Sequence, residues 1–230
     1  MGGALAYALE RYLRHTVELT CAGRTDAGVH AWGQVVSCDV RADVDLAALQ
    51  RAVNRALRPE VVIRAAEAAP AGFDARRSAS GRCYRYTVRN HPVADPFSAG
   101  TAWHVERPLD LGAMRLACDP LYGEHDFSSF CRRPPVDGAS LVRVVRHADW
   151  LDLGENMLRF EIEASSFCQQ MVRAIVGTMV EIGYGKRKAG EMTAVVRARS
   201  RAAAGQLAPP HGLCLWEVHY PRNDVGAGIS

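Results

Sequence analysis

Residues 21–40 read CAGRTDAGVHAWGQVVSCDV, which sets an arginine, Asp26 and a histidine among three evenly spaced glycines just before an apolar run. Glycine accepts positive φ angles and close backbone approach, so a tight, shaped loop is expected here. A polar turn between two strands has the same composition, since Gly and Asp are common in turns. The stretch therefore either turns the chain or holds an acid in a fixed place, and composition leaves both readings open.

Helices and strands are expected on both sides of this loop. A leucine at every fourth position predicts a helix over residues 4–14, and the apolar run predicts a strand over 33–40. Asp45 is a suitable N-cap for a second helix that Pro59 closes. The run VVIRAAEA predicts another strand over 61–68.

The second half of the chain repeats this order of elements at greater length. Alternation in RCYRYTVRN predicts a strand over 82–90 with Tyr84, Tyr86 and Val88 on one face. Further elements are expected as a helix over 111–121, strands over 141–150 and 157–164, a long helix from Phe167, a helix over 191–200 and a strand over 213–220. The pattern predicts an α+β fold of two related halves that share a mixed, largely antiparallel sheet with helices packed on it. The predicted halves are residues 1–70, which carry the loop, and residues 71–230.

The composition is compatible with an RNA-binding protein but does not require one. The chain has 230 residues, 48% of them hydrophobic, and a net charge of +3. Of its 28 basic residues only Lys186 and Lys188 are lysines. Arginine suits bidentate phosphate contacts and stacking on bases, although codon bias gives the same excess.

The cysteines and histidines point to no metal site. Seven cysteines, scattered and never spaced as C-x-x-C, predict reduced and mostly buried thiols in a cytoplasmic protein. The eight histidines have no zinc-binding spacing. No apolar run reaches membrane-spanning length, so no membrane partner is expected.

One predicted helix carries a charge in an apolar setting. Between Glu163 and Glu181, Arg173 is the only charged residue, and helical spacing sets Gln169, Gln170 and Gly177 on its side. A buried, unpaired guanidinium would be very costly. Arg173 must therefore meet a carboxylate or a phosphate, or extend to water, and pairing with a local glutamate is one of the open alternatives.

Five stretches of the chain resemble one enzyme family. AGRTDAGVHAWGQVV closely resembles the signature loop of the TruA family of tRNA pseudouridine synthases. The resemblance continues, in the family's order, through FDARRSASGRCYRYTV, GEHDFSSF, SFCQQMVRAIVGTMVEIG and APPHGLCLWEV. It covers nearly the whole chain and implies the pseudouridine synthase fold with a central active-site cleft.

The resemblance also implies a reaction and its residues. The family cleaves the N-glycosidic bond of a uridine, rotates the base and rejoins it through carbon 5, without a cofactor. Asp26 matches the catalytic aspartate, which attacks C1′ of the sugar, adds to C6 of the base or stabilises a glycal; the sequence leaves these routes open. Arg173 matches the basic partner that keeps this carboxylate ionised. Tyr84 matches the tyrosine that stacks on the target base and takes part in proton transfer.

The resemblance extends to the substrate and the assembly. Arg24 is similar to the arginine that helps extrude the nucleotide, and His30 and Gln34 are expected to face the RNA. The implied substrate is the anticodon arm of tRNA at positions 38 to 40, bound by a cytoplasmic homodimer. Three basic patches fit a phosphate-binding role: Arg76/Arg77, Arg132/Arg133 and Lys186/Arg187/Lys188.

The chain departs from the family pattern at two places. Family members begin with a Gly- and Trp-bearing strand before the first helix, and we expect such a segment to be encoded upstream of Met1. The family's His pair before MVR is Gln169-Gln170 in this chain, and the following Asn is Ala174.

Two other classes of function have weaker support. A non-catalytic RNA-binding module has no need for Asp26, Tyr84 and Arg173 together. A carboxylate-dependent hydrolase of glycosidic bonds normally uses a second acid, and the signature loop holds none.

Overall fold

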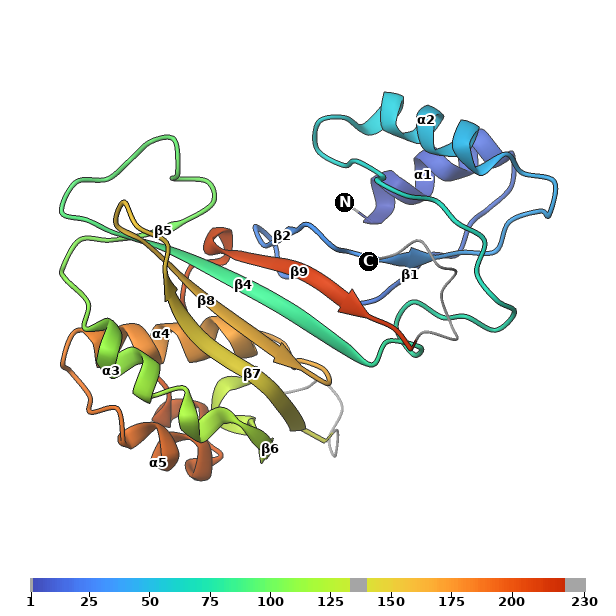
Figure 1. The fold of residues 1–230 in the computed structure, drawn as a ribbon. Coiled ribbons are helices and arrows are strands. Elements are labelled where there is room, and N and C mark those ends of the chain that lie inside the picture. The colour runs from blue at the N-terminus through green and yellow to red at the C-terminus, as the bar shows by residue number, and fades with distance from the viewer. Residues whose placement is uncertain (1, 133–139, 222–230) are drawn as a thin grey trace. The chain divides into compact units, whose positions relative to one another are not determined.

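The computed structural model describes residues 2–132 and 140–221 (Figure 1). The small unit consists of Met1–Arg24, Val35–Ala79 and Tyr220–Ser230, and the large unit of Thr25–Gln34 and Ser80–His219. The residues around Asp26 therefore belong to the large unit, whereas the chain before and after them belongs to the small one. The division into related halves near residue 70 stays a prediction.

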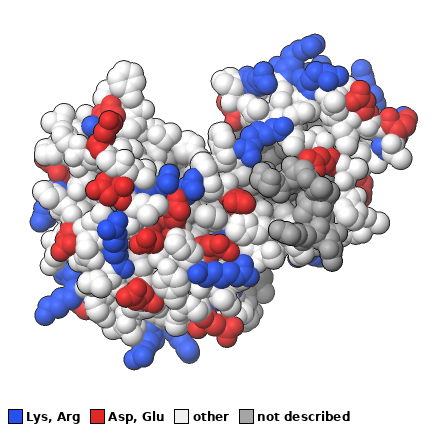
Figure 2. All heavy atoms as spheres, in the orientation of Figure 1, with Lys and Arg blue, Asp and Glu red and all other residues white. Residues whose placement is uncertain are grey.

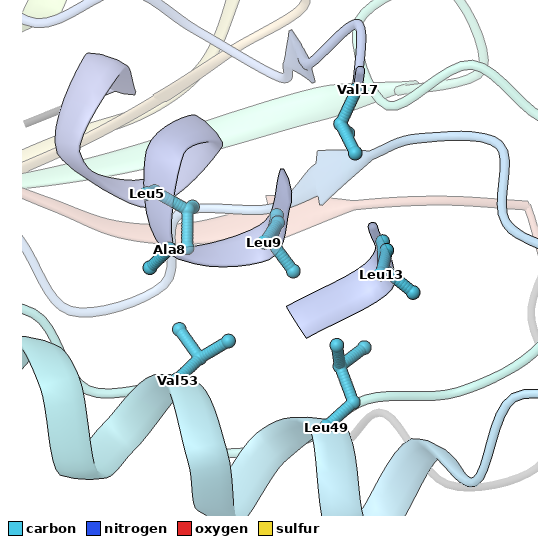
Figure 3. Close-up of a cluster of buried hydrophobic side chains, with 7 residues drawn as sticks. All are labelled: Leu5, Ala8, Leu9, Leu13, Val17, Leu49 and Val53. Atoms are coloured by element: carbon cyan, nitrogen blue, oxygen red, sulfur yellow. The ribbon is translucent and has the colours of Figure 1, made fainter. Parts of the chain in front are cut away.

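Two helices of the small unit, α1 (Gly2–Leu13) and α2 (Leu46–Leu57), share an apolar cluster. The buried members are Leu5, Ala8, Leu9, Leu13, Val17, Leu49 and Val53 (Figure 3). Full burial of a leucine side chain contributes about 1.5–3 kcal/mol, so this cluster is the main source of stability for the pair. The predicted helix with its leucine stripe is confirmed.

The ends of α2 follow the predicted signals. Asp45 is the N-cap, and its carboxylate accepts a hydrogen bond of 2.9 Å from the Ala48 amide. The helix ends at Leu57, with Arg58 as C-cap directly before Pro59, which cannot continue a helix. Both predictions are confirmed.

The strand predicted over 61–68 is wrong. These residues pair with no strand, and side chains of α2 bind backbone groups of Ile63 and Arg64 instead. The amide of Asn54 donates to the Ile63 carbonyl at 2.8 Å, and the Asn54 oxygen accepts from the Ile63 amide at 2.7 Å. Gln50 donates to the Ile63 and Arg64 carbonyls. An apolar run alone did not reveal that two polar side chains stand in for a neighbouring strand.

The strand predicted over 33–40 is shorter than expected. The small unit contains β1 (Thr20–Cys21) and β3 (Val36–Ser37), which pair antiparallel. Gly33 belongs to the large unit, where its amide donates to the Leu215 carbonyl. The predicted strand is thus divided between two units, and only its middle lies in the β1–β3 sheet.

The described part of the large unit contains a seven-stranded sheet with the order β2-β9-β4-β8-β7-β6, and β5 also pairs with β4. The strands are β2 (His30–Ala31), β4 (Gly81–Asn90), β5 (Trp103–Val105), β6 (Gly123–Asp126), β7 (Val142–Asp152), β8 (Met157–Ala164) and β9 (Leu213–His219). The β2–β9 and β4–β5 pairs are parallel, and the other pairs are antiparallel. The predicted α+β class with a mixed, largely antiparallel sheet is confirmed.

The central strands β4 and β8 each bury one face. Tyr84, Tyr86 and Val88 are buried on β4, as the alternation predicted. Their partners across the antiparallel ladder are Ile162, Phe160 and Leu158, which are buried too. Cross-strand apolar pairs of this kind fix the register, because a slip by one residue would expose the whole row.

Helices cover the buried face of this sheet. They are α3 (Leu111–Leu116), α4 (Met171–Gly183) and α5 (Glu191–Ala198), and α4 lies against the sheet (Figure 1). The helix predicted over 111–121 is α3 followed by a separate 3-10 turn, Asp119–Leu121. In α4 every residue but Arg173 and Glu181 is buried. No helix within residues 2–132 and 140–221 is long and apolar enough to cross a membrane.

The prediction that all seven cysteines are reduced thiols is wrong for one pair. Cys131 and Cys168 form a disulfide across 37 residues of sequence, with their Cα atoms 5.7 Å apart. Folding brings together a 3-10 turn, Ser128–Phe130, and the segment before α4, and no short spacing motif indicates such a contact. Of the five free cysteines only Cys118 is buried, so the expected burial is also only partly correct.

Candidate active site

The loop that carries Asp26 is fixed to strand β9 through its backbone. The amides of Trp32 and Gly33 both donate to the Leu215 carbonyl, at 2.9 and 3.1 Å. Strand β2 adds a short parallel pairing with β9, and the Trp32 ring stacks on Trp216 at 5.7 Å between centroids and 12° between planes. The end of the loop that follows Asp26 is therefore held by one edge of the large sheet.

Two glycines of the loop have the roles that the sequence suggested. Gly28 has a φ of +82°, which residues with side chains rarely adopt. Gly33 lies so close to β9 that an added Cβ would collide with the Trp216 carbonyl oxygen. The signature loop is thus a shaped structure and not only a polar turn.

Arg173 of α4 meets Asp26. Its guanidinium donates to Oδ2 of Asp26 at 2.8 Å, and the two side chains are 11% and 21% exposed. A second donor, Nε, binds the Ala208 carbonyl at 2.8 Å, while the Ala208 amide donates back to the Arg173 carbonyl. Among the alternatives for this arginine, the structure selects a carboxylate 147 residues away over a local glutamate.

A second side chain reaches the same carboxylate. The amide of Gln169 donates to Oδ1 of Asp26 in a longer hydrogen bond of 3.4 Å. Gln169 does not lie on the helix with Arg173 as predicted, because α4 begins only at Met171 after Gln170, whose φ of 69° is left-handed. The helix predicted from Phe167 thus starts later, and the turn before it points Gln169 at Asp26.

Tyr84 lies beside this pair on β4. Its side chain is 8% exposed, and its ring contacts the ring of Phe167 edge-on at 4.9 Å between centroids. Burial raises the pKa of Tyr84 to about 12; the positive charge of Arg82 opposes this shift, and the negative charge of Asp26 adds to it. The phenol is therefore neutral at physiological pH and can donate a hydrogen bond.

The other predicted substrate-binding residues do not join this group. His30 forms a hydrogen bond of 2.8 Å with the Gly100 carbonyl. Gln34 is partly buried at the end of the loop, and Arg24 is exposed at the end of a segment of the small unit. Their contacts with RNA stay predictions.

Sequence reasoning missed several parts of this site. Gln169 was noted only as a departure from the family's His pair, and neither Phe167 nor Ala208 was named as a neighbour of Tyr84 or Arg173. The one available signal was the polar Gln169-Gln170 pair directly before Met171 in an otherwise apolar stretch. Ala208 contributes only its backbone, so its side chain gave no signal at all.

The site offers a single carboxylate paired with a guanidinium. Within the described residues there is no group of three or more His, Cys, Asp or Glu side chains that could hold a metal ion. A carboxylate with one fixed cation, a neighbouring phenol and an amide donor can act as a nucleophile or stabilise positive charge on a sugar.

Comparisons with known proteins agree with this arrangement. Residues 117–221 match the model of a family described as tRNA pseudouridine synthase. Over 221 residues the chain is 42% identical to a tRNA pseudouridine synthase A of Frankia casuarinae, covering 95% of this chain and 80% of that protein. Over 215 residues it is 38% identical to the synthase A of Geobacter sulfurreducens, covering 93% and 86%. The chain therefore belongs to the tRNA pseudouridine synthase A family, whose members are isomerases.

Proposed function

We propose that this enzyme converts uridine to pseudouridine in the anticodon arm of tRNA, at positions 38 to 40, with Asp26 as the catalytic carboxylate and without a cofactor. The contact between Asp26 and Arg173 carries this proposal. The guanidinium of Arg173 holds Oδ2 of Asp26 at 2.8 Å, which fixes the position of the carboxylate that would attack C1′, add to C6 or stabilise a glycal.

The accessibility of Asp26 supports a direct role in the chemistry. Its side chain is 21% exposed, so it is not sealed in the core, while Arg173 is 11% exposed behind it. The cation is anchored a second time on the Ala208 carbonyl, which restricts its movement. In this proposal Arg173 holds the acid in place and the substrate approaches its exposed side.

Tyr84 is proposed to pack against the uracil ring. Its hydroxyl is neutral, because burial raises its pKa to about 12. The phenol therefore first acts as a hydrogen-bond donor to the base, and it can take up a proton at carbon 5 only after giving one away. Phe167 braces the ring from the side, which keeps its face toward the base.

The charge distribution supports an RNA partner. Basic side chains gather over the helices of the small unit, whereas on the large unit they alternate with acidic ones (Figure 2). Helix α2 carries the exposed residues Arg51 and Arg55 and no acidic residue. Such a face suits the phosphate backbone of tRNA.

The three basic patches named from the sequence contribute unequally to this proposal. Arg187 pairs with Glu181 at 2.7 Å, which reduces the net charge of the third patch to that of Lys186 and Lys188. Arg77 is exposed, and Arg133 lies outside the described residues. We further propose that the enzyme works in the cytoplasm as a homodimer, and the mass of the purified protein by light scattering would test the dimer.

The proposal is tested with tRNA tritiated at carbon 5 of uridine. Isomerisation exchanges the C5 hydrogen, so tritium should appear in water while no free uracil is formed. Transcripts with cytidine at positions 38 to 40 should release none. Free uracil would indicate a hydrolase, and tRNA binding without release of either would indicate a binding module; both results contradict the proposal.

A further inference from the structure

The two oxygens of the Asp26 carboxylate are held by two side chains of one segment. Arg173 binds Oδ2 at 2.8 Å, and Gln169 binds Oδ1 at 3.4 Å. Arg173 is held more firmly than Gln169. Arg173 lies on a buried helix and also binds the Ala208 carbonyl, whereas Gln169 is an exposed side chain in the turn before that helix. The longer bond from Gln169 is the one that a small displacement would break.

The turn that carries Gln169 is tied to the segment around Cys131. The neighbouring residue Cys168 forms the disulfide with Cys131, and the Gln169 carbonyl accepts a hydrogen bond of 3.0 Å from the Arg132 amide. Cys131 is 3% exposed and directly follows Phe130, which is fully buried. The bridge and the adjacent backbone bond thus tie the turn to a buried part of the large unit.

We propose that Gln169 is a positioning residue that orients the Asp26 carboxylate, and that the Cys131–Cys168 bridge holds Gln169 in place, so that the rate of isomerisation depends on the redox state of this bridge. The proposal rests on the proposed function for its rate prediction. The contacts that join the bridge, Gln169 and Asp26 come from the structure alone and do not depend on the proposed function.

The Cys131–Cys168 bridge opens by thiol–disulfide exchange. A dithiol reductant transfers two electrons and two protons to the bridge, which yields the thiols of Cys131 and Cys168, and the reductant becomes a cyclic disulfide. Opening removes the covalent anchor of the turn and leaves the Arg132 backbone bond. Gln169 then samples other orientations, and Oδ1 of Asp26 loses its donor for part of the time.

A first measurement counts thiols in protein purified without reductant and then denatured. Seven cysteines and one bridge predict five reactive thiols before reduction and seven after it. Seven thiols before reduction would overturn the proposal, because the bridge would then not form in solution.

The second measurement compares kcat and KM for tRNA with the bridge closed and open. Reduction by dithiothreitol should lower kcat about tenfold and leave KM unchanged, since misplacement of a reacting group costs rate more than binding. Cys131→Ser with Cys168→Ser should behave like the reduced enzyme. Cys214→Ser, which alters a free cysteine, should retain the full response to reduction.

The decisive comparison uses Gln169. Gln169→Ala should lose about as much kcat as reduction does, about tenfold, and reduction should then change it less than twofold, because both act through one contact. Gln169→His keeps an N–H donor and should recover part of the rate. If reduction lowers kcat equally in Gln169→Ala and in wild type, the proposal is overturned, and the bridge has a merely structural role.

A spectroscopic measurement separates this proposal from the proposed function. In protein labelled with ¹⁵N-glutamine, the side-chain amide signal of Gln169 should shift on Asp26→Asn while the bridge is closed, and should shift much less after reduction. If the Gln169 signal of the oxidised protein does not shift on Asp26→Asn, the positioning role is overturned. If this coupling is present but no variant or redox state releases tritium, the positioning stands and the proposed function fails.

Discussion

Loop 25–34 and helix α4 supply the two halves of the Asp26–Arg173 pair, and they are held in place by different forces. Among residues 25–34, all of them described, only Val29 is buried, and the loop is fixed by backbone hydrogen bonds to β9. In α4 every residue but Arg173 and Glu181 is buried, and both of these charges have ion-pair partners. Backbone hydrogen bonds hold the loop so that Asp26 stays exposed to substrate. Apolar packing of α4 fixes the helix that carries Arg173.

This difference shows why the pair can be both accessible and fixed. An exposed ion pair between two flexible side chains contributes little, about 0–1 kcal/mol. Arg173 is 11% exposed and is bound to the Ala208 carbonyl as well, so little entropy remains to be lost when it meets Asp26. Through Arg173, the buried helix thereby fixes the orientation of the Asp26 carboxylate, which the loop leaves partly exposed.

The largest expected effect comes from the loop side of the pair. Asp26→Asn should lower kcat at least about 1000-fold, a barrier increase near 4 kcal/mol, because residues 25–34 contain no other carboxylate. Binding of tRNA should be almost unchanged, since one carboxylate adds little to phosphate affinity. Tritium release and filter binding measure the two effects, and a rate within tenfold of wild type would remove Asp26 from the chemistry.

A smaller loss is expected from the helix side. Arg173→Gln should lower kcat about 100-fold, near 3 kcal/mol, because the carboxylate loses its counter-charge and the Ala208 carbonyl loses a donor. Arg173→Lys keeps the charge and should stay within about tenfold of wild type. Equal rates for the Gln and Lys variants in single-turnover assays would show that the charge of Arg173 is irrelevant.

The backbone attachment of the loop is probed by Gly33→Ala. An added Cβ would collide with the Trp216 carbonyl oxygen, a backbone atom that cannot move alone, so the free energy of unfolding should fall by about 2 kcal/mol. Gly190→Ala is the matched control, since no atom lies within 4 Å of an added Cβ there. Urea denaturation of both variants checks this, and similar midpoints would mean that the loop does not approach β9 as described.

The smallest effect concerns Tyr84, which lies on β4 beside the pair. Burial raises its pKa from the ordinary value to about 12, so it contributes stability that is complete below pH 10 and is lost as the pH rises through 12. Between pH 9 and pH 11 the free energy of unfolding should fall by about 1 kcal/mol more in wild type than in Tyr84→Phe. Urea denaturation at the two pH values measures the difference, and parallel slopes would contradict the burial of this hydroxyl.

The sequence predicted the parts of the fold that depend on local pattern. Alternation on β4, the leucine stripe of α1 and the Asp45 cap are all short-range signals, and each is confirmed. The strand over 61–68 failed because Asn54 and Gln50 satisfy its backbone from a helix, which an apolar run does not reveal.

The candidate site could be predicted only where side-chain type carried the information. Asp26, Tyr84 and Arg173 were named from residue types and motif, and the structure brings them together in the large unit. The roles of the Ala208 and Leu215 carbonyls could not be found, because any residue can supply a carbonyl. The contact of Gln169 and the bridge next to it depend on the turn at Gln170, a left-handed residue that no sequence pattern indicates.

The central claim is that the exposed loop and the buried helix are joined by the contact between Asp26 and Arg173. A double-mutant cycle on the free energy of unfolding, with Asp26→Asn, Arg173→Gln and the double variant, tests it without relying on activity. Each single variant leaves one charge without its partner, so the double variant should be less destabilised than the sum of the two, by about 1–3 kcal/mol. Additivity within about 0.5 kcal/mol would mean that the two side chains do not interact, and it would contradict the account.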